Sequence, residues 1–220
     1  MSTFDKKTPH LEIPPQEADT ERLLLERLRN SQSGADYFRW LLFVVGFYRG
    51  VQKVDAAKGL LKHFIETTDN YEQKAYCYLT LGQIAIDEQR FEAALGHFDT
   101  ALELNPKQKK IAYVLHNNAA YCLNALHRYG EGEQHALMAI EINWTRASGY
   151  RNLGISLKGQ RKMVEAGWAL VEAARLDTSD ERARVLLRTL IEESPEIALH
   201  CPWVLEGLTP NAGSEPTLRN

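Results

Sequence analysis

The feature that most constrains the fold is a helical pattern of small and large apolar residues between positions 75 and 106. Apolar residues recur at helical spacing over 81–85, and a second run over 91–102 does the same. Only the polar residues 87–90 separate the runs, which predicts a tight antiparallel helix pair that Pro106 ends. One such pair cannot bury its apolar face alone, so it needs neighbours of the same kind.

The same pattern returns twice further along the chain. A second unit starts at Tyr113, and a third starts 34 residues later at Ala147. The step from the first unit to the second is 38 residues, so we expect the second unit's first helix to begin about one turn early. The first unit has the clearest pattern, at its positions 4, 7, 8, 17, 20, 24, 27 and 32: Tyr78, Leu81, Gly82, Phe91, Ala94, Phe98, Ala101 and Pro106.

These units resemble the tetratricopeptide repeat (TPR) at nearly every diagnostic position. The resemblance covers roughly residues 38–192 and implies an all-α fold, a right-handed helical solenoid of antiparallel helix pairs. Together with the composition of the two ends, it predicts the following organisation: a disordered segment 1–16; an N-terminal helix and a divergent helix pair in 17–70; three TPR units in 71–180 (approximately 75–108, 113–146 and 147–180); capping helices in 181–208; and a disordered tail 209–220.

Composition limits the function classes. Hydrophobic content of 44% and charged content of 25% are ordinary for a soluble globular chain, and a net charge of -3 gives no reason to expect nucleic acid. The most apolar run, residues 40–48, is too short for the roughly 20 residues of a membrane span. No signal peptide is visible, and three scattered cysteines form no disulfide framework, so we expect a cytoplasmic protein.

Catalytic and metal-binding patterns are missing from the sequence. The histidines of the repeats stand singly, and none pairs with a second ligand at a metal spacing such as i, i+4. The chain has no phosphate-binding glycine loop, no Gly-x-Ser-x-Gly and no Cys-x-x-Cys. We therefore predict that the protein is not an enzyme and uses no cofactor or metal.

The resemblance does point to a binding surface. In TPR proteins the first helix of each pair lines a concave groove, mainly through positions 2, 5, 6, 9, 12 and 13. Asn118 and Asn152 stand at position 6 of successive units and resemble the asparagine ladder of groove-binding members, since an amide can pair with any peptide bond. Asparagine is also common there without a binding role. The predicted peptide-binding residues are Thr80, Gln83, Asn117, Asn118, Tyr121, Arg151 and Asn152.

The TPR class that binds the carboxylate tails of chaperones is a poorer match. That class has lysine and asparagine where this chain has Leu79 and Gln83, and lysine and arginine where it has Ser148 and Asn152. We therefore expect a non-catalytic protein-protein interaction adaptor or chaperone, with a protein or peptide partner segment in the concave groove.

Two alternatives remain open. One is a dimeric secretion-type chaperone, similar in plan to proteins with a dimerising N-terminal helix before three TPR units. It predicts a homodimer through residues 22–48. The other is a structural subunit of a larger protein assembly that uses the convex face.

Overall fold

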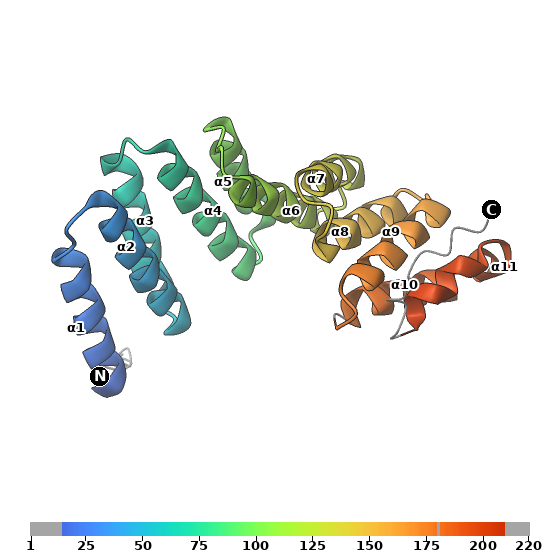
Figure 1. Ribbon diagram of the computed structural model, residues 1–220, viewed down its shortest axis with the longest axis horizontal. Helices are drawn as coiled ribbons and strands as arrows, with labels where there is room; N and C mark the ends of the chain where they lie inside the picture. The colour runs from blue at the N-terminus through green and yellow to red at the C-terminus, as the bar shows by residue number, and fades with distance from the viewer. Residues whose placement is uncertain (1–14, 180, 210–220) are drawn as a thin grey trace, which may run out of the picture. The chain divides into compact units, whose positions relative to one another are not determined.

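The computed structural model describes residues 15–179 and 181–209, so the predictions for 1–14 and 210–220 lie outside the described residues. Every regular element of these residues is a helix, which confirms the predicted all-α class (Figure 1). The chain divides into two compact units between Glu66 and Thr67. The first helix already begins at Pro15, inside the segment expected to be disordered.

The first unit contains α1 (Pro15–Arg29), α2 (Gly34–Gly50) and α3 (Val54–Thr67). Ser33 caps α2, because its side chain accepts a 3.1 Å hydrogen bond from the Asp36 backbone N–H. The rings of Tyr37 and Phe38 stack on Phe64 with centroid distances of 5.9 and 5.2 Å. These aromatic contacts join α2 to α3 at the position where the sequence predicts a divergent pair.

Glu21 ties α1 to the end of α2. Its carboxylate accepts hydrogen bonds from the Tyr48 hydroxyl at 2.8 Å and from Lys53 Nζ at 2.6 Å. The bond from Lys53 lowers the pKa of Glu21. Burial, together with the neighbouring Glu21 carboxylate, raises the pKa of Tyr48 to about 12. Glu21 is therefore charged and Tyr48 neutral at physiological pH.

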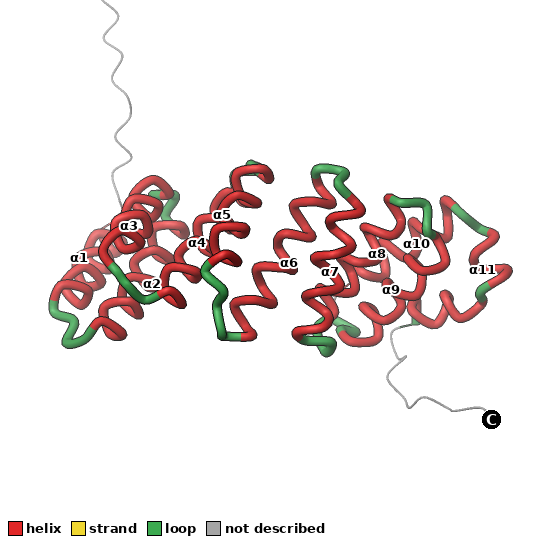
Figure 2. The backbone as a smooth tube through the Cα atoms, turned by 90° about the horizontal axis from the view of Figure 1, so that it is seen from above, coloured by secondary structure: helices red, strands yellow, loops and turns green. Residues whose placement is uncertain are grey.

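The second compact unit, which starts at Thr67, is a row of antiparallel helix pairs (Figure 2). Its helices are α4 (Tyr71–Asp87), α5 (Phe91–Glu103), α6 (Lys109–Ala125), α7 (Tyr129–Ile142), α8 (Ala147–Gly159), α9 (Met163–Leu176), α10 (Glu181–Glu193), α11 (Glu196–His200) and the 3-10 helix η1 (Pro202–Leu208). Helix α6 begins four residues before Tyr113, as the longer step between the first two units predicts.

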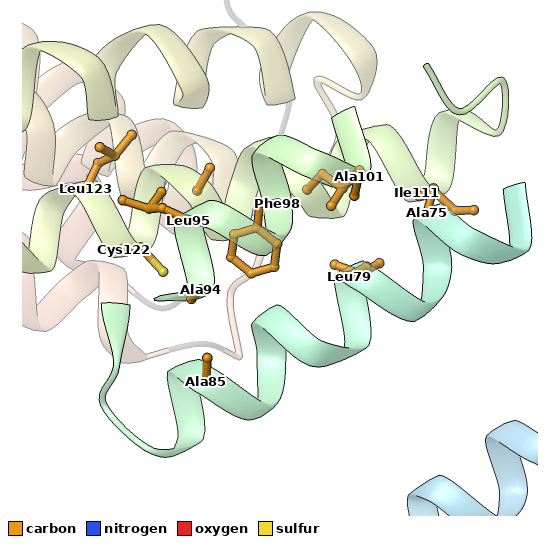
Figure 3. Packing of buried hydrophobic residues seen from close by; sticks show 12 residues of the cluster. Ala75, Leu79, Ala85, Ala94, Leu95, Phe98, Ala101, Ile111, Cys122 and Leu123 are labelled. Atoms are coloured by element: carbon orange, nitrogen blue, oxygen red, sulfur yellow. The ribbon is translucent and has the colours of Figure 1, made fainter. Parts of the chain in front are cut away.

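In two of the pairs a glycine of the first helix packs against a large residue of the second: Gly82 against Phe98, and Gly154 against Leu170. Phe98 of α5 is fully buried, and its side chain points toward α4 beside Leu79 (Figure 3). A Cβ on Gly82 would lie 2.2 Å from the Phe98 ring, so only glycine allows this approach. Close packing of this kind explains why Gly82 occupies position 8 of the unit.

The turn inside each repeat pair has a recurring backbone conformation. Gln89, His127 and Arg161 all stand at position 15 of their units and have φ of 58°, 59° and 65°. In each case the next N–H bonds back to a carbonyl five residues earlier, as in the donation from Lys162 to Leu157 at 3.0 Å. This is the Schellman pattern that ends a helix, and it reverses the chain within three residues.

The C-terminal elements cover the last full pair. Val204 of η1 is fully buried and would contact a Cβ placed on Gly167 of α9 at 3.1 Å. η1 packs on both α9 and α10. It therefore closes the apolar side of the stack, as a capping element must. Within residues 15–179 and 181–209, no helix combines the length and apolarity needed to cross a bilayer.

Candidate peptide-binding site

The first helices of the pairs in the second unit form one row. Helix α4 contacts α6, α6 contacts α8, and α8 contacts α10. We call the surface of this row the inner face and the surface of α5, α7 and α9 the outer face. All seven predicted binding residues belong to α4, α6 and α8 and are therefore on helices of the inner row.

Five of these residues keep solvent-exposed surface and two are buried. Tyr121 is 44% exposed, and its ring meets Phe91 edge-on at 6.0 Å between centroids. The others that retain exposed surface are half-buried: Gln83, Asn117, Asn118 and Arg151. Thr80 and Asn152, in contrast, are only 6% and 4% exposed.

Asn152 is used inside the protein. Its side-chain amide donates to the carbonyl oxygen of Asn117 at 2.9 Å and to Asn117 Oδ1 at 3.1 Å. Asn124 donates to the backbone carbonyl of Asn152 at 2.9 Å, and Ser156 Oγ donates to Asn124 Oδ1 at 2.7 Å. We call these four residues the amide staple. It joins α6 to α8 and satisfies polar groups that would otherwise be buried without partners.

Thr80 and Asn152 are therefore the two predicted contact residues whose side chains are buried and bonded within the protein. The Thr80 hydroxyl donates to the Tyr76 carbonyl at 2.9 Å within its own helix, and the Asn152 amide belongs to the staple. Two asparagines at the same repeat position thus have different environments, because Asn118 is half-exposed whereas Asn152 is buried. Repeat position alone does not distinguish them.

Sequence reasoning missed the other half of the staple, Asn124 and Ser156. A usable signal was present at Gly132, which stands where the first and third units have alanine. A Cβ on Gly132 would lie 2.7 Å from Asn124 Oδ1 and 2.9 Å from Ser156 Oγ. The glycine therefore makes room for a buried polar network.

Two cavities open beside α8 and α10, and sequence reasoning identified neither. One, of about 330 Å³, is lined by Thr145, Arg146, Ala147, Ser148, Arg151, Leu176, Asp177 and Arg182. The other, of about 390 Å³, is lined by Tyr129, Gly154, Ile155, Lys158, Gly159, Arg161, Met163, Leu170, Leu186 and Glu193. Of the predicted binding residues, only Arg151 lines either cavity.

A histidine pair lies between α6 and α7. The Nδ1 atoms of His116 and His135 are 3.1 Å apart, so one ring donates a hydrogen bond to the other. Burial, followed by the charge of His135, lowers the pKa of His116 to about 4. Burial also lowers the pKa of His135, against the opposing influence of Asp99 and Glu131. Both rings are therefore neutral at physiological pH.

The two buried cysteines have environments that make their thiols unreactive. Burial raises the pKa of the Cys77 and Cys122 thiols to about 12, so neither is a thiolate at neutral pH. Within the part of the chain that the structure describes, no cluster of three or more His, Cys, Asp or Glu side chains is arranged to hold a metal ion. The inner face offers amide, hydroxyl, guanidinium and aromatic groups, which suit recognition of a peptide.

Two curated proteins are similar in sequence. The chain is 33% identical over 100 residues to the Hsp70-Hsp90 organizing protein of Triticum aestivum, covering 46% of the chain and 16% of that protein. It is 30% identical over 137 residues to an uncharacterized TPR repeat-containing protein of Arabidopsis thaliana, covering 59% of the chain and 17% of that protein. The chain thus spans about a sixth of the length of both relatives. No protein-family model matches it.

Solved structures share the fold at low identity. BtubC from P. vanneervenii superposes with a TM-score of 0.70 at 14% identity, over 93% of the chain and 94% of BtubC. YrrB, described as a TPR protein with an unusual peptide-binding site, gives a TM-score of 0.58 at 15% identity, over 79% and 84%. The Hsp90 co-chaperone Cns1 from Saccharomyces cerevisiae gives 0.56 at 20% identity, over 60% and 43%.

All three repeated pairs share the turn, their first helices form one row, and two of them have the close-packed glycine, Gly82 and Gly154. The sequence relatives include a TPR repeat-containing protein, and the similar structures include another TPR protein. The chain is therefore similar in sequence to a TPR repeat-containing protein and has the helical-repeat fold of solved TPR proteins.

Proposed function

We propose that the protein is a non-catalytic adaptor or co-chaperone that binds a segment of a partner protein on the inner face. The observation that carries this proposal is the set of half-buried polar side chains that successive first helices present there. Asn118 and Arg151 supply donors and acceptors, and Tyr121 supplies an exposed aromatic surface. Gln83 and Asn117 complete the proposed contact residues; the Asn117 side chain also accepts from Asn152 and donates to Asn118 Oδ1 at 3.4 Å.

The relatives support this proposal by analogy. One sequence relative is named an Hsp70-Hsp90 organizing protein, and the structurally similar Cns1 is named an Hsp90 co-chaperone. YrrB is described as having a peptide-binding site. Because buried Thr80 and Asn152 hold the scaffold together, we assign them a supporting role behind the contact surface. The free thiols of Cys77, Cys122 and Cys201 suit a reducing compartment, where we place this role.

An affinity pull-down from native lysate tests the proposal with the full chain as bait. Joint replacement of Asn118→Ala and Tyr121→Ala should remove a specific partner that the wild type retains. Met138→Ala, an exposed position of the outer helix α7, is the matched control and should retain that partner. Circular dichroism checks that all three proteins remain folded. Retention of every specific partner by the double variant would contradict inner-face binding.

A second candidate is assembly through the outer face. Apolar side chains there are 45% to 49% exposed: Leu137 and Met138 on α7, and Val164 and Trp168 on α9. Exposed apolar surface of this kind is common at contacts between subunits. In this case Trp168→Ala, and not the inner-face variant, would release the partner.

The third candidate is a homodimer through α1 and α2 of the first compact unit. Leu23 of α1 is 53% exposed and Phe43 of α2 is 54% exposed. Two large apolar side chains on these helices favour self-association. Light scattering at high protein concentration should then give twice the monomer mass, and Phe43→Ser should return it to that of a monomer. A monomeric wild type at every concentration would rule the dimer out.

A further inference from the structure

The inner and outer helices of the second compact unit carry opposite charge. The outer helices α5, α7 and α9 have eight carboxylates and one basic residue, Arg175, which gives them a formal charge of -7. The inner helices α4, α6 and α8 have five basic residues and two carboxylates, which gives them a formal charge of +3. The whole chain carries only -3. Negative charge is therefore concentrated on the helices of the outer face.

The same face exposes a group of large apolar side chains. Val164 and Trp168 are four positions apart, so they share one side of α9. Leu137 and Met138 lie on α7, which packs on the other side of α8. All four side chains are 45% to 49% exposed. We call these four residues the outer patch, and apolar groups of this kind mark surfaces where partners bind.

Helix α8 supports both halves of the outer patch. The Trp168 ring meets Tyr150 of α8 edge-on, at 5.9 Å between centroids. Tyr150 is only 9% exposed and belongs to a buried cluster on which Ile140 of α7 also packs. Lys162 Nζ donates to Glu133 Oε2 at 2.9 Å and joins the start of α9 to α7. The patch is thus built on fixed helices, which lowers the entropy cost of binding a partner there.

The carboxylates of the outer face differ in whether the protein itself neutralises them. Three form close ion pairs: Glu131, Glu133 and Glu172. Glu141 and Glu165 are exposed and form no ion pair with the residues that the structure describes. Glu141 comes four positions after Leu137, and Glu165 comes three positions before Trp168. Each therefore lies beside the outer patch on its own helix.

These features define the chemistry of the partner. A negative face repels nucleic acid and anionic lipid, and it repels the same face of a second copy of the chain. Lysine or arginine side chains would instead be attracted to Glu141 and Glu165. An arginine can also stack on the exposed ring of Trp168. The apolar side chains of the patch require aliphatic or aromatic side chains opposite them.

We propose that the outer face of α7 and α9 is a second docking surface, which binds a basic amphipathic segment of a partner protein. Apolar side chains of the segment cover the outer patch, and its lysine or arginine side chains pair with Glu141 and Glu165. The proposal supplies a partner chemistry for the outer-face candidate. It shares no contact residue with inner-face binding, so either can hold without the other.

A random library of linear peptides tests the partner chemistry. The library is depleted on the Trp168→Ala variant and then selected on the full wild-type chain at about 150 mM salt, where exposed charges are screened beyond about 8 Å. Selected sequences should be enriched in lysine or arginine beside large apolar residues. A labelled peptide of the selected sequence is then titrated by fluorescence anisotropy.

Protein variants assign the peptide to the outer patch. Trp168→Ala should weaken binding at least tenfold, since buried tryptophans are frequent hot spots of interfaces. Trp144→Ala is the matched control, because this tryptophan is 65% exposed in the loop between α7 and α8. It should bind as the wild type does, and circular dichroism checks that both variants are folded. Equal loss in the two variants would overturn the assignment.

A charge exchange tests the electrostatic contacts without relying on a loss of binding alone. The joint variant Glu141→Lys and Glu165→Lys should bind the selected peptide at least tenfold more weakly than the wild type. It should gain affinity for a version of the peptide with glutamate at each basic position, which the wild type should not bind. Glu103→Lys, at an exposed position of α5, is the control and should change the affinity by no more than about twofold.

The remaining outcomes separate this proposal from inner-face binding. Joint replacement of Asn118→Ala and Tyr121→Ala should leave the selected peptide bound. Loss of the peptide in that variant, with retention in Trp168→Ala, would support inner-face binding and overturn the outer docking surface. Selected peptides without an excess of basic residues would also overturn it. A wild-type dimer that Trp168→Ala converts to a monomer in light scattering would assign the patch to a second copy and contradict the proposal.

Discussion

Asn152 and Asn118 occupy the same repeat position but differ in what removal of the side chain should do. Asn152→Ala leaves the Asn117 carbonyl and side-chain oxygens without their donor inside the amide staple. We expect a loss of about 1–3 kcal/mol in the free energy of unfolding. Asn118→Ala, at a half-exposed position, should change it by less than about 0.5 kcal/mol.

Urea unfolding followed by circular dichroism measures both variants. A larger loss with Asn118→Ala than with Asn152→Ala would reverse the two roles. Sequence identified both asparagines as a pair but assigned them the same role. The difference arises because Asn124 and Ser156 lie 28 and 4 residues from Asn152 and complete a network that no local pattern reveals.

Gly132 offers a second test at the residue scale. In Gly132→Ala the new Cβ would meet Asn124 Oδ1 at 2.7 Å and Ser156 Oγ at 2.9 Å, so the staple must shift. We expect a loss of about 1–3 kcal/mol in the free energy of unfolding. The control is Gly130→Ala in the same helix, where a Cβ would meet nothing within 4 Å.

Because alanine is the better helix former, the control should be neutral or stabilising by up to about 1 kcal/mol. The same urea titration compares the two variants. If Gly132→Ala were as stable as Gly130→Ala, the staple would not limit the packing of α7 against α6 and α8.

At the scale of the elements, the turns at position 15 contain non-glycine residues in the left-handed region. Gln89 has φ of 58°, a conformation that costs an ordinary residue about 1 kcal/mol. Gln89→Gly should therefore stabilise the protein by several tenths to about 1 kcal/mol, measured as a rise in the urea midpoint. Arg90→Gly is the control, because φ of -94° at that residue gives glycine no advantage. A fall in midpoint with Gln89→Gly would contradict this account.

The pair His116 and His135 between α6 and α7 should make the free energy of unfolding depend on pH. Burial lowers the pKa of His116 to about 4 in the folded protein, whereas histidine in an unfolded chain titrates near 6.5. As pH falls from about 6.5 to about 4, the unfolded state binds protons that the folded state does not. Stability from this residue is therefore present above pH 6.5 and is lost on acidification.

Thermal unfolding between pH 7.5 and 4.5 measures this effect. His116→Gln should flatten the fall in Tm over that range, whereas His200→Gln, at an exposed position in α11, should follow the wild type. Asp99 from α5 and Glu131 from α7 oppose the burial of His135, so the larger share belongs to His116. An unchanged slope in His116→Gln would contradict a buried neutral pair.

The elements themselves were the most predictable part of the structure. The repeat spacing predicts the helix pairs and the early start of α6, because side-chain size at few positions determines how the helices pack. The sequence does not predict which polar residues of the inner row stay accessible. That depends on partners from the next repeat, as the contact of Asn152 with Asn117 shows.

At the scale of the whole molecule, the proposed contact residues all lie on one face, the row formed by the first helices of the pairs. The two cavities that sequence missed combine loop and helix residues from neighbouring repeats, such as Arg146 and Arg182. No local motif brings such residues together, so only the folded stack reveals them. The proposed recognition by the inner face would therefore involve successive repeats, as in repeat proteins that build extended binding surfaces.

Hydrogen–deuterium exchange of the full chain, with and without a saturating partner segment, tests the central claim most directly. We predict slower exchange upon binding in α6, α8 and α10, and little change in α5, α7 and α9. Protection confined to the outer helices would contradict binding on the inner face.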